Sequence, residues 1–440
     1  MMNRVVEERR KSRKYDILLL GATGYTGLLT AEYIVRHLPV DLKWAIAGRS
    51  KSKLEGLSSK LKDLDPERVQ PGKQSLTTPL RYTHHTESTK KNHIEIEVVE
   101  FDDLTQLGSV VKNSKVCISV VLYWQVGEVV VKSCIENGTD YIDVAGDIPL
   151  LRTFIDRYHD AAVNASIALI HLCGVFSGPQ DLLTWAAARE LAQKTSLKTK
   201  ELVFSITEFE AGMSGGTASS LLAESTHDPR VVEEAKQPWV LSPIKRPKTP
   251  TPADFLGMRK DPTLGLLSAS SFGAIENRAL VHRTWALLQD TDQGYGPNFR
   301  YNEYIKVSSA ADGLLHILTL VLMRAALKFG PSRRILRLIL PKPGEGPDIE
   351  KERSSRVKFE AIAIADMSSG SAPRAYASFS YPSGGYHTTG LLLAQAAASL
   401  LYTRNLAGRF SGGCLTPAFL GEDFWRRIQE AGAVLQVNMV

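Results

Sequence analysis

The sequence has few cysteines and no arrangement of them that is typical of a metal site. Four cysteines occur in 440 residues, with no CxxC spacing and no neighbouring histidine cluster. Each lies among apolar or small residues, which favours buried thiols in a reducing compartment over disulfides. We therefore expect no bound metal, and we expect the thiols to be structural. They are Cys117, Cys134, Cys173 and Cys414.

The chain also lacks a strongly basic domain. Its formal net charge is +6, but the first fourteen residues alone hold six basic and two acidic side chains. The remainder is close to neutral, which excludes the basic surface that nucleic-acid binding needs. We interpret residues 1–14 as a mobile basic tail, because its acidic residues argue against an organelle-targeting peptide and no apolar secretion segment follows. A cytoplasmic location is the resulting expectation.

No run of 18 uninterrupted apolar residues occurs, so a membrane span is not predicted. The nearest approach is 313–323, which is followed by basic residues and by a second apolar patch at 335–340. We favour a core helix with a charged end. The alternatives are an amphipathic segment, 313–340, in peripheral contact with a membrane or lipid droplet, or an entrance for an apolar substrate. The basic residues are Arg324, Lys328, Arg333, Arg334 and Arg337.

The first part of the chain alternates between strand and helix patterns. This alternation predicts an α/β fold with a doubly wound parallel sheet, a Rossmann domain, over residues 15–182. Residues 63–93 interrupt it with three prolines and many polar residues, so we predict an exposed loop insertion there. The predicted strands are 15–20, 43–50, 94–101, 116–122, 140–145 and 167–172. The predicted helices are 28–38, 51–62, 103–112, 127–137 and 150–165.

The following part, residues 183–385, is less regular and is expected to form a second, α+β domain. Residues 201–210 alternate like a strand, and 354–364 and 375–381 suggest further strands of an antiparallel sheet. A helical pattern with an apolar face follows at 388–402.

The sequence GATGYTG at 21–27 lies between the first predicted strand and its helix. In such a loop Gly21 allows the tight exit from the strand, Gly24 lets the backbone approach a pyrophosphate, and Gly27 lets the helix pack closely. The helix N-terminus offers unpaired N–H groups to the phosphates. A dinucleotide-binding site is therefore predicted. Its loop residues are Gly21, Ala22, Thr23, Gly24, Tyr25, Thr26 and Gly27.

The second strand ends in Gly48-Arg49-Ser50-Lys51 and lacks an acidic residue. An acidic residue would bind the ribose hydroxyls of NAD, whereas Arg49 can bind a 2′-phosphate as a bidentate fork. NADP is therefore the predicted cofactor, in preference to NAD. Two more residues are placed at the cofactor: Asp102, which contacts the adenine or instead caps the next helix, and Val121 near the end of the fourth strand.

Several motifs together make the chain similar to a known family, over nearly its whole length. It resembles the saccharopine dehydrogenase-like oxidoreductases, and among them the trans-acting enoyl reductases. The resemblance implies a Rossmann domain, an α+β domain that covers the nicotinamide end, and C-terminal helices, 386–440, that return to the first domain. The motifs are GATGYTG (21–27), WAIAGRSKSKL (44–54), GEVVVKSCIENGTDYIDVAGD (127–147), YHDAA (158–162), SGGTASSLL (214–222), YGPNFRYNEY (295–304), LPKPGEGP (340–347) and GGCLTPAFLG (412–421).

The sequence departs from the family pattern at three strand ends. The family's Gly-Pro-Tyr stretch is VLYWQVG here (121–127), and its CGFDSIPSD is CGVFSGPQD (173–181). Its Thr-Gly-Glu is Ala-Gly-Asp at 145–147. Ligands bind at strand ends in open α/β sheets, so these changes point to a different substrate or chemistry, with loss of activity as an alternative.

Strand ends also supply the candidate catalytic residues, which we predict to be Tyr123, Asp147 and Ser177. A phenol such as Tyr123 can protonate an enolate or alkoxide, with cofactor packing as the equal alternative. Asp147 can orient substrate or simply close a turn. Asp143 and Asp181 share these strand ends, whereas Tyr158 and His159 are interpreted as structural.

The predicted function is NADPH-dependent reduction of a C=C bond in a hydrophobic, lipid-like or polyketide-like substrate, carrier-bound or free, in a biosynthetic pathway. The sequence shows no cluster of cations for an amino-acid substrate, but it has aromatic residues near the loops. One alternative is a ketone or imine reductase acting on a small metabolite. Another is a non-catalytic nucleotide-binding protein on lipid surfaces. A homodimer is a further hypothesis.

Overall fold

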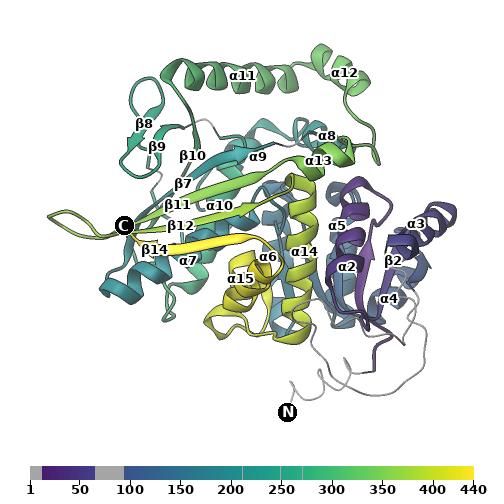
Figure 1. Ribbon diagram of the computed structural model, residues 1–440. Helices are drawn as coiled ribbons and strands as arrows, with labels where there is room; N and C mark the ends of the chain where they lie inside the picture. Colours follow the sequence, from purple (N-terminus) through teal and green to yellow (C-terminus); the bar gives the residue numbers. More distant parts are fainter. Residues whose placement is uncertain (1–11, 65–93, 211, 248, 270) are drawn as a thin grey trace.

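Figure 1 shows the computed structural model, which describes residues 12–64, 94–210, 212–247, 249–269 and 271–440. The chain forms two seven-stranded sheets, each with its own helices. The predicted α/β fold with a second α+β domain is confirmed.

The first sheet is parallel throughout, in the order β13-β6-β5-β4-β1-β2-β3. Its central strand, YDILLL, is almost completely buried, as expected of a parallel strand covered on both faces. The chain crosses from β1 to β2 on one side and later to β4 on the other, which creates a ligand-binding crevice at the carboxyl ends of these strands. The strands are β1 (Tyr15–Leu20), β2 (Trp44–Gly48), β3 (Glu95–Val98), β4 (Ser114–Ser119), β5 (Asp140–Asp143), β6 (Ala168–Ile170) and β13 (Gly413–Leu415).

Helices connect these strands, as the alternating pattern predicted. Each predicted helix is present with boundaries that differ by a few residues. The boundary at 182/183 divides α7, which starts after β6 and packs on the second sheet. The helices are α2 (Tyr25–His37), α3 (Lys51–Leu64), α4 (Leu104–Lys112), α5 (Tyr123–Asn137), α6 (Ile148–Asn164) and α7 (Gly178–Thr195).

The second sheet has the order β14-β12-β11-β7-β10-β9-β8, with only the β7–β10 pair parallel. Its strands are β7 (Thr199–Phe209), β8 (Met258–Asp261), β9 (Gly265–Ser268), β10 (Arg300–Lys306), β11 (Val357–Ala365), β12 (Arg374–Tyr381) and β14 (Val434–Met439). Its helices are α8 (Gly215–Glu224), α9 (Pro229–Ala235), α10 (Ala274–Leu288), α11 (Ala310–Lys328), α12 (Gly330–Ile339) and α13 (Ile349–Ser354).

The C-terminal segment returns to the first sheet, as predicted, but it also completes the second. After α14 (Gly385–Tyr402), strand β13 pairs with β6 at the edge of the first sheet. Then α15 (Gly421–Glu430) leads to β14, which pairs with β12 at the edge of the second sheet. The description of 386–440 as helices alone is therefore wrong, and the two sheets share this segment. Short 3-10 turns lie at η2 (Ala407–Arg409) and η3 (Pro417–Leu420).

Two apolar helices have opposite environments. Helix α14 is buried along almost its whole length, and Gly390 lets it approach the backbone of α2 closely. Helix α11 carries a comparable apolar sequence but leaves most of it exposed. It is also the one helix in the described residues that is long and apolar enough to span a membrane, and only 11% of its apolar window is buried. The core-helix interpretation of 313–323 is therefore wrong.

The predicted basic tail lies mostly outside the described residues, as does nearly all of the predicted 63–93 insertion. Arg13 lies within the described residues, and its side chain forms hydrogen bonds. Its guanidinium donates to the Thr139 hydroxyl at 3.0 Å and to the Asn137 carbonyl at 2.6 Å. The ordered first domain therefore begins before the predicted residue 15.

Candidate active site

The phosphate loop connects β1 to α2 in a conformation that requires glycine. Gly21 has φ +83°, and a Cβ there would lie 3.0 Å from the Val120 carbonyl carbon of the neighbouring strand. A Cβ on Gly27 would overlap the carbonyl oxygen of Gly21. Helix α2 begins after Gly24, and no side chain caps it there. Its first N–H groups are therefore available to a pyrophosphate, so the loop fits a dinucleotide.

The other loop residues surround this turn. Ala22 is buried, whereas Thr23 and Thr26 are half-buried at the start of the helix. The backbone nitrogen of Val121 lies 3.1 Å from the position that a Gly21 Cβ would take, so it borders the same crevice. The structure thus places these predicted cofactor residues together.

The residues predicted to choose the cofactor lie at the end of β2. Gly48 is buried, Arg49 is exposed directly after it, and the Ser50 hydroxyl lies 3.3 Å from that of Ser52. Lys51 starts α3. An exposed guanidinium beside a serine hydroxyl at this edge fits the 2′-phosphate of NADP.

Asp102 is exposed in the turn after β3, at the same side of the crevice. The helix that follows is capped by its neighbour, because the Asp103 carboxylate accepts from the N–H groups of Thr105 and Gln106 at 3.0 and 2.9 Å. The capping alternative for Asp102 is therefore wrong, and contact with the adenine remains its predicted role.

A distant segment of the chain crosses the phosphate loop. The Tyr25 hydroxyl donates to the Pro347 carbonyl at 2.9 Å. A Cβ on Gly346 would overlap the Tyr25 ring, so this segment lies flat against it. The ring of Tyr386, from the start of α14, meets Tyr25 edge-on at a centroid distance of 5.0 Å. The LPKPGEGP motif thus packs against the phosphate loop.

The SGGT motif meets the same cluster. The Ser214 N–H donates to the Tyr386 hydroxyl at 2.7 Å, and the Gly215 N–H donates to the Glu345 carbonyl at 2.9 Å. A side chain on Gly215 would overlap the Lys342 carbonyl. Three motifs far apart in the sequence therefore converge around Tyr25. The sequence marked each motif but gave no sign that they touch.

Tyr123, one predicted catalytic residue, is the first residue of α5 and is only 8% exposed. Its ring packs against Phe154 at 4.8 Å, and its hydroxyl is buried without a hydrogen-bond partner in the described structure. Burial raises the pKa of this phenol well above its usual value. These surroundings place Tyr123 in the protein core; its proposed contact with a substrate or cofactor stays a prediction.

Asp147, the second predicted catalytic residue, has two hydrogen-bond partners. One carboxylate oxygen caps α6 by accepting from the Leu150 N–H at 3.0 Å. The other lies 2.9 Å from Nε2 of His227, in the loop between α8 and α9. The turn-closing role is thus real, but the carboxylate also orients an imidazole. Sequence reasoning missed His227, because it lies eighty residues away without a motif of its own.

His227 lines a cavity of about 130 Å³ that opens beside the carboxyl end of β5. Two carboxyl groups that line the cavity have raised pKa values. Burial raises the pKa of Glu224 to about 8 and that of Glu276 to about 7. Near neutral pH the cavity therefore contains proton donors beside the imidazole. Its lining residues include Gly146, Ile148, Pro149, Glu224, His227 and Glu276.

Ser177, the third predicted residue, is buried at the N-cap position of α7. Asp181 lies one turn later and accepts from the Thr284 hydroxyl at 2.6 Å and the Ala418 N–H at 2.8 Å. This carboxylate therefore ties the C-terminal segment to α7. His159 likewise has a structural partner, since its Nδ1 accepts from the Cys414 N–H at 3.1 Å.

A buried ion pair lies under the same strand ends. Nδ1 of His171, after β6, lies 2.8 Å from the carboxylate of Asp143 at the end of β5. Burial by itself lowers the pKa of this imidazole, but the Asp143 carboxylate outweighs it and raises the pKa to about 9. The pair therefore links β5 and β6 in the charged form.

This pair makes stability depend on pH. The folded pKa of His171 is raised, from 6.5 to about 9, so its stabilisation is complete below about pH 6.5 and disappears as pH rises through about 9. The loss amounts to roughly 3 kcal/mol. We expect the urea midpoint of the native chain to fall more steeply across this range than that of His171→Gln, which keeps only the smaller fall due to groups such as Glu224 and Glu276. Parallel curves for the two proteins would refute this assignment.

An aromatic cluster flanks the end of β6. Phe176 is 41% exposed, and its ring lies 4.8 Å from that of Phe209 and 6.5 Å from that of Phe272. Phe272 is itself 37% exposed. The partly exposed rings form an apolar surface beside this strand end.

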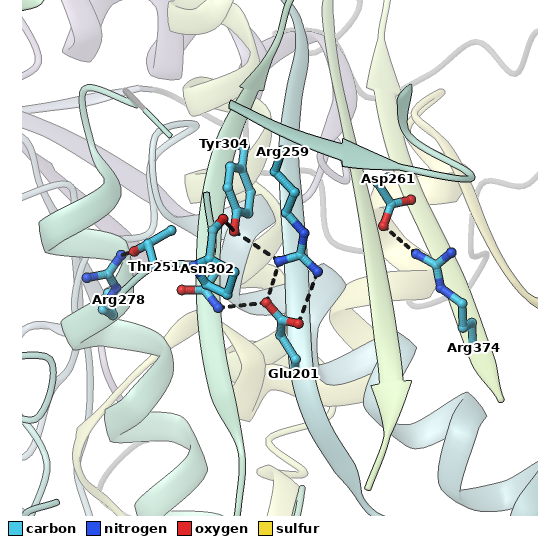
Figure 2. Close-up of polar contacts among 9 residues, drawn as sticks. Glu201, Thr251, Arg259, Asp261, Arg278, Asn302, Tyr304 and Arg374 are labelled. Carbon is cyan, nitrogen blue, oxygen red and sulfur yellow. Dashed lines mark hydrogen bonds and ion pairs between the residues drawn. The ribbon is translucent and has the colours of Figure 1, made fainter. Parts of the chain in front are cut away.

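Two arginines of the second sheet, Arg259 and Arg374, are already engaged, as Figure 2 shows. Arg259 forms a two-pronged contact with Glu201, at 2.5 and 3.1 Å. Arg374 binds Asp261 at 2.5 Å. Such pairing leaves these side chains without free charge for a substrate carboxylate.

Comparison with known proteins agrees with this geometry. Residues 17–170 match the saccharopine dehydrogenase NADP binding domain family. A Mycobacterium tuberculosis (strain H37Rv) protein, provisionally described as a trans-acting enoyl reductase, is 29% identical over 97% of this chain and 98% of its own. A trans-acting enoyl reductase of Mycobacterium bovis (strain BCG / Pasteur 1173P2) is 26% identical over 96% of this chain and 97% of its own.

The fold itself is similar to a solved structure of saccharopine dehydrogenase (L-Glu forming) from Saccharomyces cerevisiae. The TM-score is 0.51 at 14% identity, over 97% of this chain and 100% of that one. That likeness concerns the fold alone. The matched NADP binding domain and the full-length similarity to trans-acting enoyl reductases make the chain an NAD(P)-dependent oxidoreductase that is similar to the saccharopine dehydrogenase-like enzymes, and its cofactor is NADP.

Proposed function

We propose that the protein uses NADPH to reduce the C=C bond of a hydrophobic, α,β-unsaturated acyl substrate of lipid or polyketide type. The observation that carries this proposal is the aromatic cluster of Phe176, Phe209 and Phe272 beside the strand ends. The engagement of Arg259 and Arg374 with carboxylates of the protein also supports an apolar substrate over a dicarboxylate. The full-length relatives named trans-acting enoyl reductase support the reaction type.

The residues present fit the cofactor. The loop 21–27 would hold the pyrophosphate, Arg49 and Ser50 the 2′-phosphate, and Asp102 the adenine. Tyr25 would be fixed by the segment that ends at Pro347. When bound, NADPH supplies the hydride that is added to the carbon β to the carbonyl.

The chain itself would supply the proton for the α carbon. His227 is held by Asp147 and faces the cavity that contains the protonated carboxyl groups of Glu224 and Glu276. We assign His227 as the proton donor and Asp147 as its positioning residue. Glu224, which lines the same cavity, would return a proton to the imidazole after each turnover.

The proposal is tested by following NADPH absorbance with α,β-unsaturated thioesters of increasing acyl length. We expect consumption of NADPH that becomes more efficient with chain length, because the apolar contact area grows. Saturated ketones and cyclic imines serve as the comparison. Turnover of these compounds in preference to every enoyl thioester would overturn the proposal.

We also propose a cytoplasmic location. All four cysteines are buried and unpaired, which is typical of proteins in a reducing compartment. A role in a biosynthetic pathway is part of the same hypothesis, because the substrate type belongs to lipid or polyketide assembly.

A further inference from the structure

Helices α11 and α12 extend end to end along one side of the molecule, beyond the second sheet (Figure 1). Only one face of α11 is attached to the protein. Gly313 lies against Met258, and the Ile317 side chain lies near Gly257, at the start of β8. Leu320 is buried on the same face. The opposite face of α11 is left open.

Most of the exposed side chains on that open face are apolar. On α11 its residues follow helical spacing, so they form one continuous stripe. On α12, Leu338 is 83% exposed and Ile339 is 71% exposed. This area is far richer in apolar side chains than the surface of an ordinary soluble domain. The exposed residues are Leu314, Leu315, Leu318, Val321, Leu322, Phe329, Ile335, Leu338 and Ile339.

Positive charge accompanies the apolar face. Residues 310–340 contain five arginines or lysines and a single acidic residue, Asp312. Arg334 and Arg337 are exposed on α12, an amphipathic helix whose exposed residues also include Ile335, Leu338 and Ile339. A helix that is apolar on one side and basic on the other is suited to lie in the headgroup region of an anionic membrane.

The topology allows α11 and α12 to contact a membrane only along its surface, because α11 cannot cross the bilayer. The strands before and after it, β10 and β11, both pair with β7 in one sheet. A spanning α11 would place these strands on opposite sides of a bilayer. The attachment of Gly313 and Ile317 to the β8 segment also keeps the helix parallel to the protein surface.

A second copy of the chain is a poorer occupant for this face. Pairing two copies through the same patch would bring two sets of five basic residues together, with only Asp312 of each to offset them. Anionic phospholipids instead neutralise this charge while their acyl chains receive the aliphatic stripe.

We propose that the α11–α12 surface docks the protein on anionic phospholipid membranes. The surface adjoins the candidate active site, because Arg333 of α12 donates to the Ser225 carbonyl at 2.8 Å, two residues from His227. The docking itself does not depend on the reaction proposed above. It requires only that the surface meets anionic lipid.

Vesicle flotation of the full chain tests the proposal. With phosphatidylcholine vesicles that contain phosphatidylserine, we expect the protein to float, and we expect weaker binding without phosphatidylserine or at high salt. Failure to float with anionic vesicles at low salt would overturn it. So would a dimer that forms through this face and binds no vesicles.

Two variants locate the contact. Leu315→Glu/Leu318→Glu and Arg334→Glu/Arg337→Glu should each reduce the vesicle affinity by about tenfold or more. The matched controls, Leu104→Glu on α4 and Lys112→Glu/Lys132→Glu on α4 and α5, should float like the native chain. NADPH binding by every variant verifies the fold. Equal flotation of the α11–α12 variants and the controls would disprove the assignment.

Discussion

Replacing His227 with asparagine is expected to lower kcat by about 10²–10⁴-fold, the usual contribution of a positioned general acid. NADPH affinity should be unchanged, because His227 lies by the β5 end and not at the phosphate loop. Asparagine keeps a hydrogen bond to Asp147 but cannot deliver a proton. Pre-steady-state and steady-state measurements of NADPH oxidation with an enoyl thioester give the comparison.

The control is His37→Asn, at the end of α2, where the imidazole packs against the Tyr33 ring away from the site. It should retain native kcat. Asp147→Asn should give a smaller loss and should alter the pH profile of kcat, since Asp147 acts through His227. Native turnover by His227→Asn would assign the proton to another group, such as Glu224.

Arg49→Asp is expected to reverse the choice of cofactor. The change removes the charge-assisted hydrogen bonds to the 2′-phosphate, each worth roughly 1.5–3 kcal/mol, and adds a repelling carboxylate. The Kd for NADPH should rise by about a hundredfold or more, while the Kd for NADH should stay constant or fall. Fluorescence titration with both nucleotides measures the two constants.

Lys53→Asp is a matched control, because Lys53 is an exposed cation one turn further along in α3. It should shift both affinities slightly and equally, through long-range charge alone. If Arg49→Asp weakened NADPH and NADH to the same extent, the side chain would be structural. The 2′-phosphate would then be bound elsewhere.

The first sheet could be predicted from the sequence, because its strands are buried on both faces and appear as continuous apolar runs. YDILLL and the GATGYTG loop that follows illustrate this. The edge strand β13 could not be predicted, because it is only three residues long and its partner β6 lies 245 positions earlier. Such a strand exists only through tertiary pairing.

Burial was harder to predict than helix formation. The segments that became α14 and α11 are both long and apolar, yet α14 is enclosed and α11 is open. A helical pattern in the sequence does not indicate which neighbouring elements will cover the helix. Glycines made part of the difference, since Gly390 allows α14 to approach α2.

The candidate site was predicted where its residues are contiguous, as in the phosphate loop, and missed where they are brought together by folding. Tyr25 meets Pro347 across 322 positions, and Asp147 meets His227 across 80. No local pattern encodes either contact. The signal that remained was the presence of specific motifs without an assigned role, LPKPGEGP above all.

The most direct test of the account uses NADPH that carries deuterium at C4 of the nicotinamide, on the transferred face, with a long-chain α,β-unsaturated thioester. Mass spectrometry and NMR of the product locate the label. The account predicts a saturated thioester with deuterium on the β carbon and a solvent-derived proton on the α carbon. Deuterium on a carbinol or amine carbon of the product, or recovery of unreacted thioester and NADPH, would contradict it.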